Sequence, residues 1–173
     1  MHSKFIASYC GNHTMTLDSV AASSCLSAAC LEWLSEQSFD SEHLSATGQF
    51  DDTPLIRACR RGEADIVAEL LTQGADAVAL NHRNMDGTNA LWAAVVADSN
   101  VIADQLIDAG IDINNLNDNG ASVLMYAASA GKTPWVEYLL GKGVDTRAET
   151  LDGFTALDLA ANIECLRLLR KAA

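Results

Sequence analysis

The run NNLNDNG at 114–120 has residue types and a spacing that could bind a metal ion. Asn115, Asn117 and Asn119 alternate there in the rhythm of the first ligands of an EF-hand calcium loop. Such a loop also needs a bidentate glutamate at its twelfth position, and counted from Asn115 that position is Tyr126. A phenol cannot replace a carboxylate, so we expect no calcium site and interpret the run as a turn.

Cysteines and histidines of the N-terminal segment are the other candidates for metal binding or catalysis. Cys10 and His13 have a C-x-x-H spacing, but zinc needs four ligands and no second pair lies at a suitable spacing. Cys25 and Cys30, on one helix, would point in different directions, and we expect both to be buried. No phosphate loop, nucleophile elbow or HExxH motif occurs. We expect no cofactor and no catalytic residue; an enzyme or metal-dependent module using these Cys and His residues is the alternative.

Charge and cysteine usage exclude several classes of partner. The net charge of −12 comes from 11 basic and 23 acidic residues, which leaves little to bind a nucleic-acid backbone. No apolar run approaches the roughly 18 residues of a membrane helix. Five cysteines without a CxxC motif or an export signal predict reduced thiols in the cytoplasm. We expect a cytoplasmic protein that binds neither nucleic acid nor membrane, and delivery into a host cell as an effector stays open.

An internal repeat organises most of the chain. The stretches DGTNALWAA, DNGASVLMYAA and LDGFTALDLAA align on Leu91, Leu124 and Leu157, each 33 residues after the one before. Leu55, in DDTPLIRAC, begins an earlier copy. A second landmark, in LLTQGAD, LIDAGID and LLGKGVD, puts a glycine 19 residues after each of the first three leucines. Each copy is typical of two short amphipathic helices that must stack on their neighbours to bury their apolar faces.

The period and the motif Thr53-Pro54-Leu55 resemble those of the ankyrin-repeat family. The resemblance implies an all-α repeat solenoid, with an ankyrin array of about four helix-turn-helix units joined by β-hairpin fingers. The array occupies 49–173, and its units are about 49–83, 84–116, 117–149 and 150–173. The single-domain build favours a bacterial member.

The last unit and the inter-unit contacts depart from the family pattern. Ile56, Trp92, Met125 and Asp158 replace the usual histidine, so packing should carry more of the coupling between units. The last unit lacks about three residues between its helices, and we interpret it as a cap in which Ile163, Leu166 and Leu169 close the stack.

The segment before the array does not repeat. We expect a disordered tail over 1–15 and an N-terminal capping helix with its linker over 16–48. The helix itself should cover roughly 18–37 and dock on the first repeat, whose open apolar face needs a cover.

The resemblance also implies a site: finger tips and the exposed side of each first helix would recognise another protein. The tips mix apolar and acidic side chains, so the partner should have a basic and apolar surface. We expect Leu80 and Leu116 at finger ends. The predicted partner-binding residues are Phe50, Asp52, Arg60, Arg61, Met85, Asp86, Thr88, Val96, Leu116, Asp118, Asn119, Leu151, Asp152 and Phe154.

Overall fold

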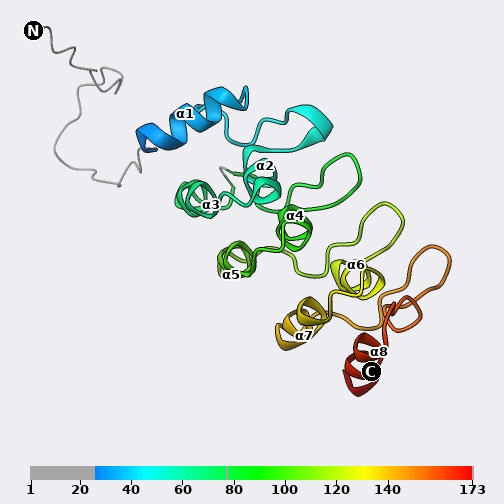
Figure 1. Cartoon of the computed structure of the whole chain (residues 1–173). Helices are drawn as coiled ribbons and strands as arrows, with labels where there is room; N and C mark the ends of the chain where they lie inside the picture. Colours follow the sequence, from blue (N-terminus) through cyan, green and yellow to red (C-terminus); the bar gives the residue numbers. More distant parts are fainter. Residues whose placement is uncertain (1–25, 77, 173) are drawn as a thin grey trace, which may run out of the picture.

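The computed structural model describes residues 26–76 and 78–172, which form an all-α repeat solenoid. Its helices stack in two rows, α2, α4 and α6 beside the fingers and α3, α5 and α7 behind them (Figure 1). The helices are α1 (Ala28–Glu36), α2 (Pro54–Arg61), α3 (Ala64–Leu71), α4 (Ala90–Val96), α5 (Asn100–Asp108), α6 (Val123–Ser129), α7 (Thr133–Gly141) and α8 (Ile163–Ala172). The predicted tail at 1–15, with Cys10 and His13, and also Cys25 lie outside the described residues.

Each first helix starts at a side-chain cap. The Thr53 hydroxyl accepts from the backbone N–H of Ile56 at 3.3 Å, and Pro54 at the first helical turn loses no hydrogen bond there. Asn89 and Ser122 cap α4 and α6 in the same way. Helix α2 ends at Gly62, which adopts the left-handed conformation at φ 74°. Polar caps thus set where α2, α4 and α6 begin. They thereby also set where the finger before each of these helices ends.

The core runs along the whole array. The repeated leucines Leu55, Leu91 and Leu124 are all buried, and each lies on the first helix of its unit. Small residues such as Ala58 and Ala94, also fully buried, let neighbouring helices approach closely. The periodic leucines therefore mark the residues that hold the units together.

The fingers are turns rather than hairpins with regular strands. Among the described residues, the only β-type pairing is an isolated antiparallel bridge between Leu116 and Ser122. The expected β-hairpins are therefore tight turns, each closed by a main-chain hydrogen bond such as that from the Asn84 N–H to the Thr88 carbonyl at 3.0 Å.

The two ends of the array differ from the prediction. In the last unit, residues 156–159 form a turn where a first helix was expected, and α8 follows directly. Ile163 is exposed rather than part of the closing core, which contains Leu169 and Cys165. At the other end, α1 begins at Ala28 behind its cap Ser27, later than the predicted start at 18.

Candidate protein-binding surface

The finger turns are built by one acceptor side chain each. Asn84 Oδ1 accepts from the backbone N–H groups of Asp86 and Thr88 at 3.1 and 3.0 Å. Asn117 Oδ1 accepts in the same way from Asn119 and Ala121 at 3.0 and 2.9 Å. A glycine with positive φ closes each of these turns. The run NNLNDNG is therefore a turn, as its composition predicts.

The first finger forms a similar turn without a glycine. Asp51 occupies the place that glycine has in the later fingers, and both Phe50 and Asp51 have positive φ, 63° and 59°. His82 supports this turn from the second finger, because its Nε2 donates to the Asp51 carbonyl at 2.8 Å. Two non-glycine residues in the left-handed region store strain that the neighbouring finger must offset.

Main-chain hydrogen bonds join successive finger tips in one register. The Met85 N–H donates to the Phe50 carbonyl at 3.1 Å. The Asp118 N–H donates to Asp86 at 3.2 Å, and the Leu151 N–H donates to Asn119 at 3.0 Å. These three bonds, which we call the tip ladder, fix the distance between the side chains that successive fingers present.

Asparagines add a second set of bonds between units. Asn81 Oδ1 accepts from the Asp112 N–H at 2.7 Å, and 33 residues later Asn114 Oδ1 accepts from the Asp145 N–H at 2.8 Å. The expectation that packing replaces polar coupling was therefore incomplete. The equal spacing of the two asparagines in the sequence was the signal that could have revealed these bonds.

Large apolar side chains are exposed along the fingers. Of the nine such residues exposed in the described part of the chain, six are predicted site residues on the fingers or the inner helices. They are Phe50, Met85, Val96, Leu116, Leu151 and Phe154, exposed by 55, 59, 49, 38, 80 and 50 %. We call these six residues the apolar ridge. A row of exposed apolar groups with a polar rim is typical of a protein interface.

Asp52 does not belong to this surface, contrary to the prediction. Its side chain is fully buried, and its carboxylate lies 3.0 Å from Arg60 Nη2 and 3.6 Å from Arg57 Nε. Asn84 Nδ2 also donates to it at 3.2 Å. Two guanidinium groups and an amide compensate its burial, so Asp52 positions Arg60 instead of contacting a partner.

Six of the other predicted residues fall into two groups. Arg60, Arg61, Asp86, Asn119 and Asp152 are exposed and available to a partner. Thr88 is half-buried and donates to Asn84 Oδ1 at 2.9 Å, so it serves the turn.

Arg83, which the sequence did not single out, ties two fingers together. Its Nη2 lies 3.0 Å from Asp118 Oδ1 and donates to the Leu116 carbonyl at 3.0 Å. A hollow of about 490 Å³ opens beside these residues and extends to Leu151. Leu80, expected at a finger end, is buried instead.

A polar cluster joins the second and third units on the side of the second helices. The Asp98 carboxylate accepts from Trp135 Nε1 at 2.5 Å and from Lys132 Nζ at 3.2 Å. The hydrogen bond from Trp135, and then that from Lys132, lowers the pKa of Asp98. Asp98 follows α4 at the position that Gly62 and Gly131 occupy after α2 and α6. Like those glycines it has a positive φ, of 60°.

Asp104 extends this cluster on α5. It accepts from Lys142 Nζ at 2.6 Å and from the Tyr138 hydroxyl at 2.8 Å. Both hydrogen bonds lower the pKa of Asp104, that from Lys142 more strongly. In this cluster, each carboxylate already accepts hydrogen bonds from side chains of the neighbouring unit. The cluster therefore joins the two units.

The described cysteines form no disulfide. Cys30, Cys59 and Cys165 are free and buried. Burial raises the pKa of Cys30 to about 11, and Glu69 adds to this shift. The Cys30 thiol therefore stays protonated at neutral pH. Within residues 26–76 and 78–172, no three His, Cys, Asp or Glu residues are placed to hold a metal ion, and no helix could cross a bilayer.

Comparison with known families and proteins agrees with this geometry. The family model described as Ankyrin repeats (3 copies) matches residues 19–117 and 97–173. This chain belongs to the ankyrin-repeat family. Ankyrin repeats are protein-protein interaction modules and are generally non-catalytic. A bacterial origin stays a prediction.

Three curated relatives share parts of this array. The chain is 29 % identical over 121 residues to the ankyrin repeat and SAM domain-containing protein 6 of Rattus norvegicus, covering 66 % of this chain and 13 % of that protein. It is 31 % identical over 100 residues to the inactive serine/threonine-protein kinase TEX14 of Bos taurus, covering 56 % and 6 %. It is 30 % identical over 132 residues to a probable serine/threonine-protein kinase of Dictyostelium discoideum, covering 73 % and 16 %. The chain thus spans a small part of each relative's length.

Proposed function

We propose that this ankyrin-repeat chain binds a partner protein through the apolar ridge and the exposed arginines of α2. Binding would work by occupancy, so that the chain acts as an adaptor, a scaffold or an inhibitor in the cytoplasm. The observation behind this proposal is the concentration of exposed apolar side chains on fingers whose spacing the tip ladder fixes.

Rigid spacing matters because a preorganised surface loses little conformational freedom on binding. The ladder is made of main-chain atoms, and Asn84 and Asn117 hold each turn from within. The apolar side chains can therefore meet a partner without first ordering the loops that present them. Phe50 and Phe154, at opposite ends of the ridge, offer the aromatic groups that often dominate interface energies.

The charges of the ridge define the partner further. Asp86 and Asp152 are exposed beside the apolar tips, and neither has an ion pair within the described residues. A partner that places lysines or arginines around an apolar centre would complement this pattern and associate faster at low salt.

The experiment is affinity capture from the source cell with four purified chains: wild type, Met85→Ala, the pair Met85→Ala with Phe154→Ala, and Val101→Ala. Val101, on α5 and away from the ridge, is 61 % exposed and so matches Met85 at 59 %. We expect one protein to be retained by the wild type and by Val101→Ala, weakened by the single Met85 variant, and lost from the pair.

Circular dichroism spectra and melting temperatures of all four chains check that folding is unchanged. Binding of the same protein equally to the ridge pair and to wild type would show that the interface lies elsewhere. Loss of that protein from Val101→Ala as well would place the interface on the second helices.

A further inference from the structure

The two ends of the array have opposite charge. Residues 26–48 hold four acidic residues and no lysine or arginine. Helix α8 holds one acidic residue and three basic ones, within a chain whose acidic residues outnumber the basic ones about twofold. The four acidic residues are Glu32, Glu36, Asp40 and Glu42, and the three basic ones are Arg167, Arg170 and Lys171.

The last two cations of α8 differ from the other described lysines and arginines in having no ion pair with a described residue. Each lysine or arginine between 57 and 167 lies within 4.0 Å of a carboxylate. Within the described residues, Arg170 and Lys171 have no such pair. In a chain with so many acids, two unpaired cations side by side are an excess that an acidic surface outside the molecule could neutralise.

Helix α1 presents an acidic surface of this kind. Its inner side buries Cys30, Trp33 and Leu34 in the core, and the Ser27 hydroxyl donates to Glu69 on α3 at 2.7 Å. The residues at helical spacing on the opposite side are all exposed: Ala28, Leu31, Glu32, Ser35 and Glu36. We call this set, with Glu42 in the loop that follows, the acidic end. Leu31, 41 % exposed, gives it an apolar contact point.

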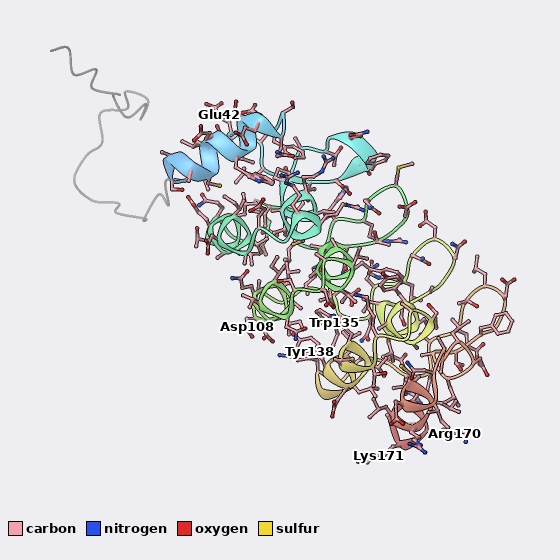
Figure 2. All side chains as sticks on the ribbon, viewed as in Figure 1. Glu42, Asp108, Trp135, Tyr138, Arg170 and Lys171 are labelled. Carbon is pink, nitrogen blue, oxygen red and sulfur yellow. The ribbon has the colours of Figure 1, made fainter. Side chains whose placement is uncertain are left out.

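Helix α8 has the complementary arrangement. It buries Cys165 and Leu169 and exposes Ile163, Arg167, Arg170 and Lys171, which we call the basic end. Arg167 is partly neutralised by Glu164, at 2.8 Å on the same helix. The two ends lie at opposite extremes of the molecule, where Figure 2 shows Glu42 at one extreme and Arg170 with Lys171 at the other.

We propose that the chain associates with a second copy of itself, with the basic end of one molecule docked on the acidic end of the next. Leu31 and Ile163 lie in the two surfaces as apolar contacts, and the surrounding charges are opposite in sign. Because the two surfaces are different, the contact is heterologous, and it leaves a free end on each outer molecule to which another can add.

The net charge of −12 does not prevent this contact. Charges screen one another over about 8 Å at physiological ionic strength. Packed helices lie about 8 to 10 Å apart, so the acids of inner units are separated from the contact by at least one helix layer. The local charges of the two ends, which attract, therefore decide the sign of the interaction.

Charge reversal gives a test with the full chain. One variant reverses the acidic end, Glu32→Lys with Glu36→Lys; another reverses the basic end, Arg170→Glu with Lys171→Glu. None of these four side chains has an ion pair within the described residues, so folding should be unaffected. We expect the wild-type weight-average mass in sedimentation equilibrium to rise with concentration and to fall with added salt, and each variant to stay monomeric alone.

The mixture of the two variants is the decisive measurement. Reversed acidic ends can bind reversed basic ends, so association should return when the variants are mixed and in a chain with all four substitutions. Asp65→Lys with Asp108→Lys changes net charge as the first variant does, at exposed sites of α3 and α5, and should associate as wild type does. A wild type that is monomeric up to its solubility limit at physiological ionic strength, or variants that associate unmixed, would overturn the proposal.

Discussion

The third and fourth units differ although they share a sequence pattern. Unit 117–149 forms both α6 and α7, and its Leu124 is fully buried. Unit 150–173 replaces the first helix by a turn at 156–159, and its Leu157 is only half-buried. The third unit packs between two others, whereas the fourth packs on α7 and has three residues fewer between its leucine and the helix that follows. The same motif thus forms a first helix in the third unit and a turn in the fourth, where its leucine is less buried.

The repeated leucines provide the largest test of this difference. Leu124→Ala should reduce the free energy of unfolding by about 2 to 5 kcal/mol, because it removes burial and leaves a cavity. Leu157→Ala should cost less than half as much, since the side chain is already partly in water. Urea unfolding of the two variants measures both values. Equal losses would mean that the turn at 156–159 packs as tightly as α6.

The finger turns offer a smaller contrast between the same units. Asn117 satisfies two backbone N–H groups, whereas Thr150 Oγ1 accepts from one, that of Phe154 at 3.1 Å. Asn117→Ala should cost about 0.5 to 1.5 kcal/mol per hydrogen bond lost, and Thr150→Ala about half as much in total. Thermal melts of both variants and of Asn117→Asp, which keeps an acceptor oxygen, compare them. Asn117→Asp should stay close to wild type, and a loss like that of Asn117→Ala would point to a packing role.

The junctions on either side of the third unit should differ in sensitivity to acid. Asp98 and Asp104 join it to the second unit, and both have a pKa lowered in the folded state. A lowered pKa means stability that is present above the unfolded pKa, near 3.9, and is lost as the pH falls through the folded pKa. The junction with the fourth unit uses uncharged groups, such as Asn162 Nδ2 donating to the Gly131 carbonyl at 3.0 Å.

We therefore expect the melting temperature to fall between pH 5 and pH 2, and to fall less in the double variant Asp98→Asn with Asp104→Asn. Asn162→Ala should lower the melting temperature at every pH and leave the size of the acid-induced fall as in wild type. If the melting temperature of the Asp98 and Asp104 double variant fell with acid as much as that of wild type, other groups would be responsible for the acid sensitivity. Asp158, whose pKa is lowered by Thr155 in its own turn, is the next candidate.

The fold was predictable where one residue type repeats at a fixed spacing. Leu55, Leu91 and Leu124 identified the first helices, and the run after Asn115 was correctly interpreted as a turn. The missing first helix of the last unit was not predictable from its motif. Ala156 and Leu157 have the same residue types as Ala90 and Leu91, which begin a complete first helix in the second unit.

The site was predictable to the extent that position in the repeat determines exposure. Met85, Leu151 and Phe154 are exposed as expected. Asp52 was assigned to the surface from its position in the repeat, and only the fold brings Arg57, Arg60 and Asn84 together around it. Whether a partner binds this surface stays a prediction.

The tip ladder has a consequence for how this surface can change. Its donors are the backbone amides of Met85, Asp118 and Leu151, which almost any side chain leaves in place. Proline alone has no amide hydrogen, so a proline at any of these three positions would remove one bond and release that finger from its neighbour. The side chains of the surface could thus be varied widely for new targets. Proline substitutions at the three donor positions would show which bonds of the tip ladder hold the fingers in place.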